Sequence, residues 1–229
     1  NMLRKNNSKS GRAIIQRLIP CAAIKKFFNC FGVEIIRKKN IPSVTLLGLK
    51  NMPVRTIIDI GANRGQFARY ISKVFPTAKI LCFEPLPDPY AELQNWVDYQ
   101  GGRVVAMNVA LGAENRDVIM VMHEEHSPSS SILHTTEISD KLYPQTRKQR
   151  KIQIQQKTLD DVLRDNDLES LVLIKMDVQD YEDRVIAGGR NIFAKIHACI
   201  TEICLDILYQ GQATFHDLSN YLSSLGYFY

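Results

Sequence analysis

A carboxylate and two glycines stand at a spacing that suits a small-molecule binding turn. The segment 56–67 joins an apolar run to a turn containing Gly61 and Gly65, and Asp59 comes just before that turn. This spacing differs from the G-x-G-x-x-G of dinucleotide-binding strands, whose glycines let the backbone approach a pyrophosphate. A carboxylate in this place repels phosphate but accepts hydrogen bonds from an ammonium group. The alternative is an ordinary strand–turn–helix corner that needs its glycines for backbone reasons.

A second acidic residue ends the next apolar run. Glu84 closes the run 79–84, roughly 20 residues after the glycines, where a carboxylate that holds two ribose hydroxyls is found in nucleoside-binding sheets. Pro85 then ends the strand and stiffens the loop. Taken alone, Glu84 is better explained as a solvated charge at a strand end than as a ribose-binding carboxylate. Its pairing with Asp59 favours a nucleoside site.

Several other short motifs accompany these residues in the order typical of one family. The chain resembles the FkbM family of S-adenosylmethionine-dependent methyltransferases from about residue 56 to residue 227. The matching segments are 59–67, 83–85, 108–112, 129–131, 158–161, 175–182 and 201–202. Each segment alone is a weak signal, but seven in family order are a specific one.

The resemblance implies a fold, a methyl donor and an activity. The fold is a Rossmann-like class I methyltransferase sheet of the α/β class, doubly wound and mostly parallel. The cofactor is S-adenosyl-L-methionine, and the reaction is O-methylation of a hydroxyl on a sugar, polysaccharide or secondary metabolite. The residues implied to contact the donor are Asp59, Gly61, Ala62, Asn63, Gly65, Phe67, Glu84, Pro85, Asn108, Ala110 and Asp177. Among these, Asp59 is expected at the amino-acid end of the donor, and Asn108 and Ala110 at its adenine.

Two other functions stay open on the residues alone. A nicotinamide-dependent oxidoreductase shares the sheet and Glu84 but not the G-x-G-x-x-G turn. A donor-binding partner protein without catalysis is the other alternative, because Asp180 stands where the family usually has the glycine of D-V-Q-G-x-E. If the backbone there has a positive φ, aspartate adopts it less freely than glycine.

Three acidic residues are predicted to lie on the acceptor side of the donor. Asp177 ends an apolar run, Glu182 follows it within a helical turn, and Glu202 ends the next run. Ligands of open α/β sheets collect at the carboxyl ends of the strands, so all three are expected at one edge. Methyl transfer to a hydroxyl needs a group that removes its proton or orients it, and Asp177 is the first candidate, with Glu182 and Glu202 in support. The alternatives are a helix cap for Asp177 and a loop anchor for Glu202.

The region between the third and fourth predicted strands holds weaker candidates. His123, His126 and His134 could supply a base at neutral pH, although loop histidines are more often bystanders. The serines 129–131 look like the family's serine-rich loop. They contact a polyol acceptor or the donor, or they form a plain solvated loop.

Strands and helices alternate along the chain as a parallel doubly wound sheet requires. The apolar runs predict strands at 55–60, 79–84, 103–109, 171–177 and 197–203. Helices are predicted near 64–75, 88–97, 182–194 and 213–225. Between the third and fourth strands, 117–123 and 151–157 alternate like a hairpin pair, which predicts a β insertion.

Length and composition fit one α/β domain with a short extension. The chain has 229 residues, of which 45% are hydrophobic, enough for a sizeable core. Residues 1–50 carry eleven basic residues and one acidic residue, whereas the rest carries eighteen basic and twenty-three acidic ones. The body is therefore a poor nucleic-acid surface. The five cysteines form no C-x-x-C pair, so reduced thiols in a cytoplasmic protein are expected, rather than disulfides or a metal site.

The predicted domains are a basic helical arm, 1–50, and a methyltransferase domain, 51–229. The arm has a helical pattern over 13–39 with a break near Pro20. It packs on the domain as a helical cap, or it attaches peripherally to an anionic membrane. No apolar run reaches the length of a membrane span. The chain stops soon after 213–225, so the domain is expected to lack the final antiparallel hairpin of such a sheet.

Overall fold

A computed structural model describes residues 48–163, 168–169 and 171–228 of the chain. The predicted helical pattern over 13–39 lies outside the described residues. Residues 50–229 form one compact unit. In the described part of the chain, no helix is long and apolar enough to cross a bilayer.

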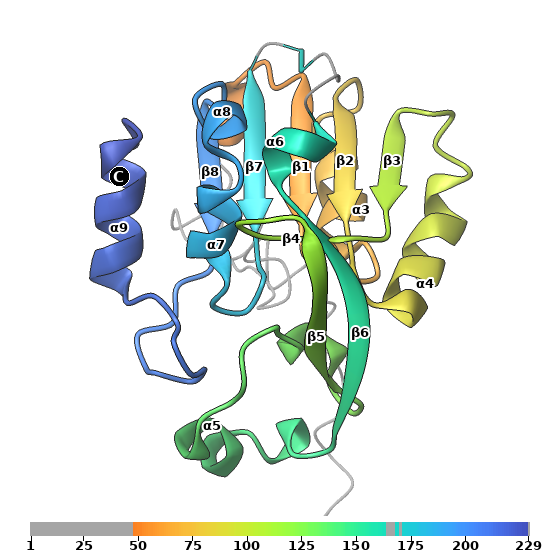
Figure 1. Ribbon diagram of the computed structural model, residues 1–229. Coiled ribbons are helices and arrows are strands. Elements are labelled where there is room, and N and C mark those ends of the chain that lie inside the picture. Colours follow the sequence, from red (N-terminus) through yellow and green to blue (C-terminus); the bar gives the residue numbers. More distant parts are fainter. Residues whose placement is uncertain (1–47, 164–167, 170, 229) are drawn as a thin grey trace, which may run out of the picture. The chain divides into compact units, whose positions relative to one another are not determined.

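Within the described residues, five parallel strands form the central sheet (Figure 1). Their order is β3-β2-β1-β7-β8. Their bounds are Thr56–Ile60 for β1, Lys79–Phe83 for β2, Val104–Met107 for β3, Val172–Met176 for β7 and Ala198–Thr201 for β8. The first strand lies in the middle and the chain crosses to both sides of it, which is a doubly wound arrangement. The five predicted strands and the predicted fold class are confirmed.

The sheet forms where it does because its middle strands are apolar on both faces. All five residues of β1 are buried, as expected of a central strand covered by helices on both sides. The core around it includes Ile58, Phe83, Ile174 and Phe193. Asp59 is the charged residue of β1, and its side chain has no exposed surface. A charge in that position needs a partner inside the protein.

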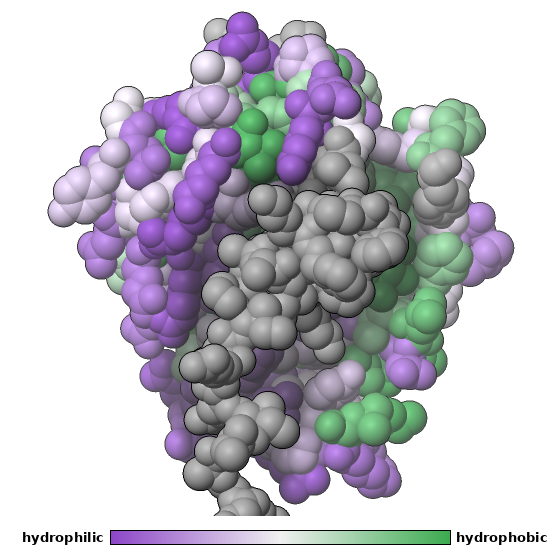
Figure 2. Space-filling view, turned by 180° about the vertical axis from the view of Figure 1, so that it is seen from behind, coloured by the Kyte–Doolittle hydropathy of each residue, from purple (hydrophilic) through white to green (hydrophobic). Residues whose placement is uncertain are grey.

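Helices cover both faces of the sheet. In Figure 1, α6, α7 and α8 lie in front of the sheet and α3 lies behind it. The helices are α3 Gln66–Val74, α4 Pro87–Val97, α6 Leu159–Val162, α7 Glu182–Ala187, α8 Arg190–Phe193 and α9 Phe215–Ser224. Seen from behind, hydrophilic side chains cover much of the left half of the surface, and apolar ones gather on the right half (Figure 2).

The prediction of a single helix over 182–194 is wrong. The chain forms α7 and α8 instead, separated at Gly188 and Gly189. Gly188 packs backbone to backbone against the loop after β4, because a Cβ there would lie 2.0 Å from the carbonyl oxygen of Gly112. Two successive glycines also weaken a helix interior. The break therefore allows a close approach that a continuous helix with side chains would block.

The insertion forms a second sheet beyond the carboxyl edge of the first (Figure 1). It contains β4 Ala110–Leu111, β5 Arg116–His123 and β6 Gln149–Lys157, in the order β4-β6-β5. The predicted hairpin pair is confirmed, since β5 and β6 are antiparallel. The third strand is shorter than predicted, because the chain leaves the central sheet and pairs in parallel with β6 through β4.

Short helices at the tip of the insertion were not predicted. They are η3 Ser127–Ser129, α5 Glu137–Leu142 and η4 Pro144–Thr146. A further short helix that was not predicted, η2 Leu49–Asn51, precedes the first strand. The tip folds back onto the segment after β8, where the Thr136 N–H donates to the carbonyl of Leu208 over 2.8 Å. The insertion therefore encloses the carboxyl edge of the central sheet from one side.

Candidate functional site

Two adjoining cavities lie at the carboxyl edge of the central sheet. The first lies between the turn after β1, the loop after β2 and the insertion, and its lining includes Gly61, Asn63, Glu84, Pro85, Leu86, Ala110, Met120, Ser127 and Ile132. The second lies between the loops after β7 and β8 and the tip of the insertion, and its lining includes His126, Ser129, Ser139, Tyr143, Gln179, Asp180, Glu182, Glu202 and Tyr209. Asp177 and Pro128 line both cavities. Asp177 therefore stands at their boundary.

The turn after β1 is built so that glycine is required. Gly61 has a φ of 72°, and a Cβ on it would lie 2.0 Å from the carbonyl oxygen of Asp177. The N–H groups of Gly61 and Ala62 both donate to the carbonyl of Phe83 over 3.0 Å. Gly65 begins α3 with a φ of 81°. These contacts fix the turn to the ends of β2 and β7. Gly61, which has no side chain, lines the first cavity.

Glu84 at the end of β2 faces the first cavity with its charge held by the backbone. Its side chain is almost completely buried, and its two oxygens accept from the N–H groups of Asn63 and Leu86, each over 2.8 Å. Burial raises the pKa of Glu84 to about 7, although the two N–H donors lower it. Each carboxylate oxygen keeps a second lone pair for a ligand hydroxyl. This is the arrangement that a carboxylate needs to bind a ribose.

The other predicted donor residues divide into cavity lining and supporting groups. Asn63, Pro85 and Ala110 line the first cavity. Asn108 does not appear in that lining, because its side-chain amide donates to the carbonyls of Glu84 and Pro85, over 2.8 and 3.0 Å. Asn108 therefore holds the loop that carries Glu84, and its expected contact with an adenine stays a prediction.

Asp59 has a charged partner within the protein. Its carboxylate is fully buried beneath the turn and lies 3.2 Å from the ammonium nitrogen of Lys175, its direct neighbour across the strands. The contact is an ion pair, since neither oxygen of Asp59 has a well-aligned hydrogen-bond donor. Burial raises the pKa of Asp59, and Lys175 opposes that rise. Asp59 is therefore paired with an ammonium group of the protein, and its expected place at the amino-acid end of the donor stays a prediction.

Lys175 is the site residue whose role the sequence did not predict. Its Nζ lies 5.8 Å from the centre of the Phe67 ring, so Phe67 packs beside this ammonium. Phe67 is not part of the first cavity's lining. Ala62 and Gly65 likewise shape the turn without lining that cavity. The available signal was a lone lysine inside the otherwise apolar run 171–176. Its cross-strand partner could not be read from the sequence.

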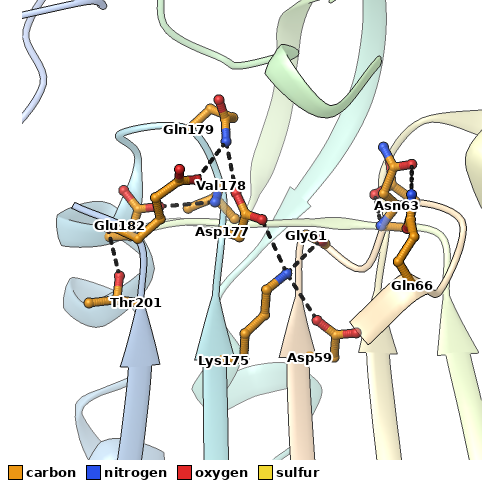
Figure 3. Close-up of polar contacts among 12 residues, drawn as sticks. Asp59, Gly61, Asn63, Gln66, Lys175, Asp177, Val178, Gln179, Glu182 and Thr201 are labelled. Atoms are coloured by element: carbon orange, nitrogen blue, oxygen red, sulfur yellow. Dashed lines mark hydrogen bonds and ion pairs between the residues drawn. The ribbon is translucent and has the colours of Figure 1, made fainter. Parts of the chain in front are cut away.

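The three predicted acidic residues do come together at the second cavity. Gln179 joins two of them, because its side-chain amide donates to Asp177 Oδ1 over 2.7 Å and to Glu202 Oε2 over 3.3 Å (Figure 3). Glu182 is 5% exposed and accepts from the Val178 N–H over 2.9 Å. Burial raises the pKa of Glu182 to about 7. Burial, and then the charge of Asp177, raise the pKa of Glu202.

The serine-rich segment is not a plain solvated loop. Ser130 and Ser131 are buried: the Ser130 hydroxyl accepts from the His123 N–H, and the Ser131 hydroxyl donates to the carbonyl of Gln179. Ser129 lines the second cavity, and its carbonyl accepts from the Tyr209 hydroxyl over 2.7 Å. These bonds tie the insertion to the loop after β7, so the walls of the second cavity support one another.

The three candidate histidines have different surroundings. His123 is buried, and its ring nitrogens have no hydrogen-bond partner among the described residues. His126 lines the second cavity, and its Nδ1 lies 2.7 Å from Ser129 Oγ. His134 is exposed and is absent from the lining of either cavity. His126 is therefore the histidine that the structure places near the acidic residues.

Replacing Asp180 by glycine should stabilise the protein. Asp180 has a φ of 67°, the left-handed conformation in which glycine has no Cβ penalty. Burial also raises the pKa of Asp180 to about 6, so its charge is unfavourable at neutral pH. We expect Asp180→Gly to raise the free energy of unfolding by about 1 kcal/mol, after allowing for the greater freedom of glycine in the unfolded chain. Urea unfolding at pH 7.5 measures this change.

Asp180→Asn is the matched control, because it removes the charge and keeps a side chain in the left-handed region. A smaller gain for asparagine than for glycine would separate the backbone contribution from the charge. No gain for glycine would contradict the expectation that Asp180 is strained.

The chain is similar in sequence to known methyltransferases. Residues 59–229 match the family model described as the methyltransferase FkbM domain. The 2-O-methyltransferase NoeI of Sinorhizobium fredii is 31% identical over 186 residues, which cover 78% of this chain and 75% of that protein. The methyltransferase sdnD of Sordaria araneosa is 30% identical over 171 residues, covering 61% of this chain and 62% of that protein. A solved precorrin-6y C5,15-methyltransferase from Geobacter metallireducens is 14% identical, covers 84% of this chain and 74% of its own, and has a TM-score of 0.46.

Proposed function

This chain belongs to the FkbM methyltransferase family and is a methyltransferase, and from that premise we propose that it transfers a methyl group from S-adenosyl-L-methionine to a hydroxyl group. The acceptor that we propose is a sugar, a polysaccharide or a secondary metabolite. The name of its relative NoeI, a 2-O-methyltransferase, supports oxygen as the acceptor atom. The observation that carries the proposal is Glu84, a buried carboxylate facing the first cavity beside the Gly61 turn.

The residues of the first cavity suit the donor. Glu84 would hold the two ribose hydroxyls, and it lies beside the turn at Gly61, where a glycine is needed because a Cβ would collide with the carbonyl oxygen of Asp177. Apolar side chains, among them Met120 and Ile132, offer a flat wall for the adenine. The donor, when bound, supplies an electrophilic methyl group on a sulfonium.

The second cavity suits a hydroxylated acceptor. Its lining combines carboxylates with the hydroxyl groups of Ser129, Tyr143 and Tyr209, all of which form hydrogen bonds with polyols. We propose that Asp177, at the boundary of the two cavities, receives the proton of the acceptor hydroxyl or orients that hydroxyl. Glu182 and Glu202 support it from the acceptor side. In-line transfer depends on this alignment of donor and acceptor more than on any covalent step by the protein.

The protein should bind S-adenosylmethionine and S-adenosylhomocysteine but not nicotinamide dinucleotides. The reason is Glu84, whose oxygens can accept from two ribose hydroxyls, beside a G-x-x-x-G turn that lacks the dinucleotide-binding glycines. Titration calorimetry with S-adenosylhomocysteine and with NAD measures the affinity of the protein for each ligand. A ligand that binds only the folded state also raises the thermal midpoint, which gives an independent check. Tight binding of NAD with no binding of S-adenosylhomocysteine would contradict the proposal.

A further inference from the structure

A single buried ammonium connects the donor side of the site with the acceptor side. The side chain of Lys175 is 11% exposed, and its Nζ lies 3.0 Å from the carbonyl oxygen of Gly61 (Figure 3). The same nitrogen lies 3.2 Å from Asp59 Oδ1 and 3.6 Å from Asp177 Oδ2. These groups come from the inside of β1, from the turn that follows it and from the end of β7.

We propose that Lys175 is a positioning residue for methyl transfer, which holds the carboxylate of Asp177 at the boundary of the two cavities and in fixed relation to the Gly61 turn. The proposal rests on the proposed function, because it gives Lys175 its effect through Asp177. Lys175 thus has two roles, since it neutralises Asp59 and also positions Asp177.

The contacts of Asp177 show why it needs such a partner. Its side chain is 38% exposed, and its two oxygens are held from different directions, Oδ1 by the amide of Gln179 and Oδ2 by Lys175. Without the ammonium, Gln179 would still donate to Oδ1 of Asp177, but Oδ2 would lose its counter-charge, and Gln179 also bonds Glu202. The side chain of Asp177 would then lose its tie to the donor turn, whereas the backbone N–H of Asp177 would still donate to the carbonyl of Ile60. A displacement of about 1 Å is enough to cost about 100-fold in rate when groups must be aligned.

The charges favour a cation that stays protonated. Two carboxylates face one ammonium, and together they raise the pKa of Lys175, although burial alone would lower it. The contact with Gly61 is a hydrogen bond to a backbone carbonyl, which needs a donor and not only a positive charge. Lys175 is therefore a cation with two ion pairs and one hydrogen bond, which together join the Gly61 turn to the side chain of Asp177.

Lys175→Met alone cannot separate positioning from stability, because it leaves Asp59 buried without its counter-charge. Loss of one partner of a buried ion pair is strongly destabilising, and we expect a midpoint lower by about 10 °C. The informative variant is Asp59→Asn/Lys175→Met, which removes both charges and keeps side chains of similar size. We expect this double variant to recover most of the lost thermal stability and to bind S-adenosylhomocysteine within about fivefold of the wild type.

The readout specific to positioning is the side-chain amide of Gln179, which reports on Asp177 directly. Its 1H–15N signals can be assigned by their loss in Gln179→Glu and followed in the protein saturated with S-adenosylhomocysteine. We expect them to move in Asp59→Asn/Lys175→Met and to stay in place in Lys195→Met, which removes an exposed lysine outside both cavity linings. With any hydroxyl acceptor that the wild type methylates, kcat of the double variant should fall by about 30-fold or more, with KM for the acceptor changed only a few-fold.

Unchanged Gln179 signals in a stable, ligand-bound double variant would overturn the proposal and leave Lys175 as the counter-charge of Asp59. Wild-type turnover by that variant would do the same. Failure of the proposed function looks different, because the wild type itself would then show no heat of binding with S-adenosylhomocysteine.

Discussion

Glu84→Gln should weaken the binding of S-adenosylhomocysteine by about 1.5 to 3 kcal/mol, or roughly 10- to 100-fold in Kd. The substitution keeps the size of the side chain but removes the charge that two ribose hydroxyls would share. It also turns an amide NH2 toward the N–H of either Asn63 or Leu86, both of which now donate to a carboxylate oxygen. Calorimetry at pH 8 measures the loss.

Glu125→Gln is the matched control, since Glu125 is exposed and is absent from the lining of both cavities. It should bind the ligand like the wild type. If Glu84→Gln remains folded and keeps wild-type affinity, Glu84 does not hold the ribose, and the donor must bind elsewhere along the carboxyl edge.

The same residue should make binding depend on pH. Burial raises the pKa of Glu84 to about 7 in the free protein, and hydroxyl donors stabilise only its ionised form. Affinity for S-adenosylhomocysteine should therefore be highest above pH 7, fall by up to about tenfold for each pH unit below it, and level off at the loss of roughly 10- to 100-fold expected for Glu84→Gln. Glu84→Gln should lose this dependence.

The stability of the unliganded protein should respond to pH with the opposite sign. The pKa of Glu84 is raised from 4.5 to about 7, so the folded state holds this proton more tightly than the unfolded state. The contribution of Glu84 to the free energy of unfolding therefore decreases as the pH rises from 4.5 to about 7. Glu182, whose pKa burial also raises to about 7, adds to the same trend.

The sequence predicted the elements that depend on local patterns. Buried parallel strands are continuous apolar runs, so β1, β2 and β7 were visible without a structure. Because the carboxyl ends of parallel strands meet at one edge of the sheet, the sequence alone predicts that Glu84 and Asp177 lie near one another. Both do line the first cavity.

The parts that the sequence missed depend on contacts between distant segments. Asp59 and Lys175 pair because β1 and β7 are neighbours in register, although more than a hundred residues separate them in the chain. The local sequence around a carboxylate before a glycine turn does not indicate whether that carboxylate pairs with a ligand or with a lysine of the protein. The break at Gly188 is similar, since it follows from the close approach of Gly112 and not from the helical pattern around it.

Asp177→Asn should leave the affinity for S-adenosylhomocysteine within a few-fold and reduce turnover by about 100-fold or more, the usual contribution of general base catalysis. Asparagine keeps the volume of the side chain, and its carbonyl oxygen can still accept from Gln179, as Asp177 Oδ1 does over 2.7 Å. What it removes is the negative charge at the boundary of the two cavities. The measurement is single-turnover methyl transfer from S-adenosylmethionine to a hydroxyl acceptor that the wild type methylates.

Asp117→Asn, an exposed position on β5 whose carboxylate accepts from Gln153, is the matched control and should turn over normally. Wild-type turnover by Asp177→Asn would move the base to Glu182, and then to His126, which also lines the second cavity. A collapse of donor affinity would instead assign Asp177 to the donor site, since it lines the first cavity as well. The two outcomes differ because a general base acts only on the acceptor proton, whereas a group that holds the donor is needed before any acceptor binds.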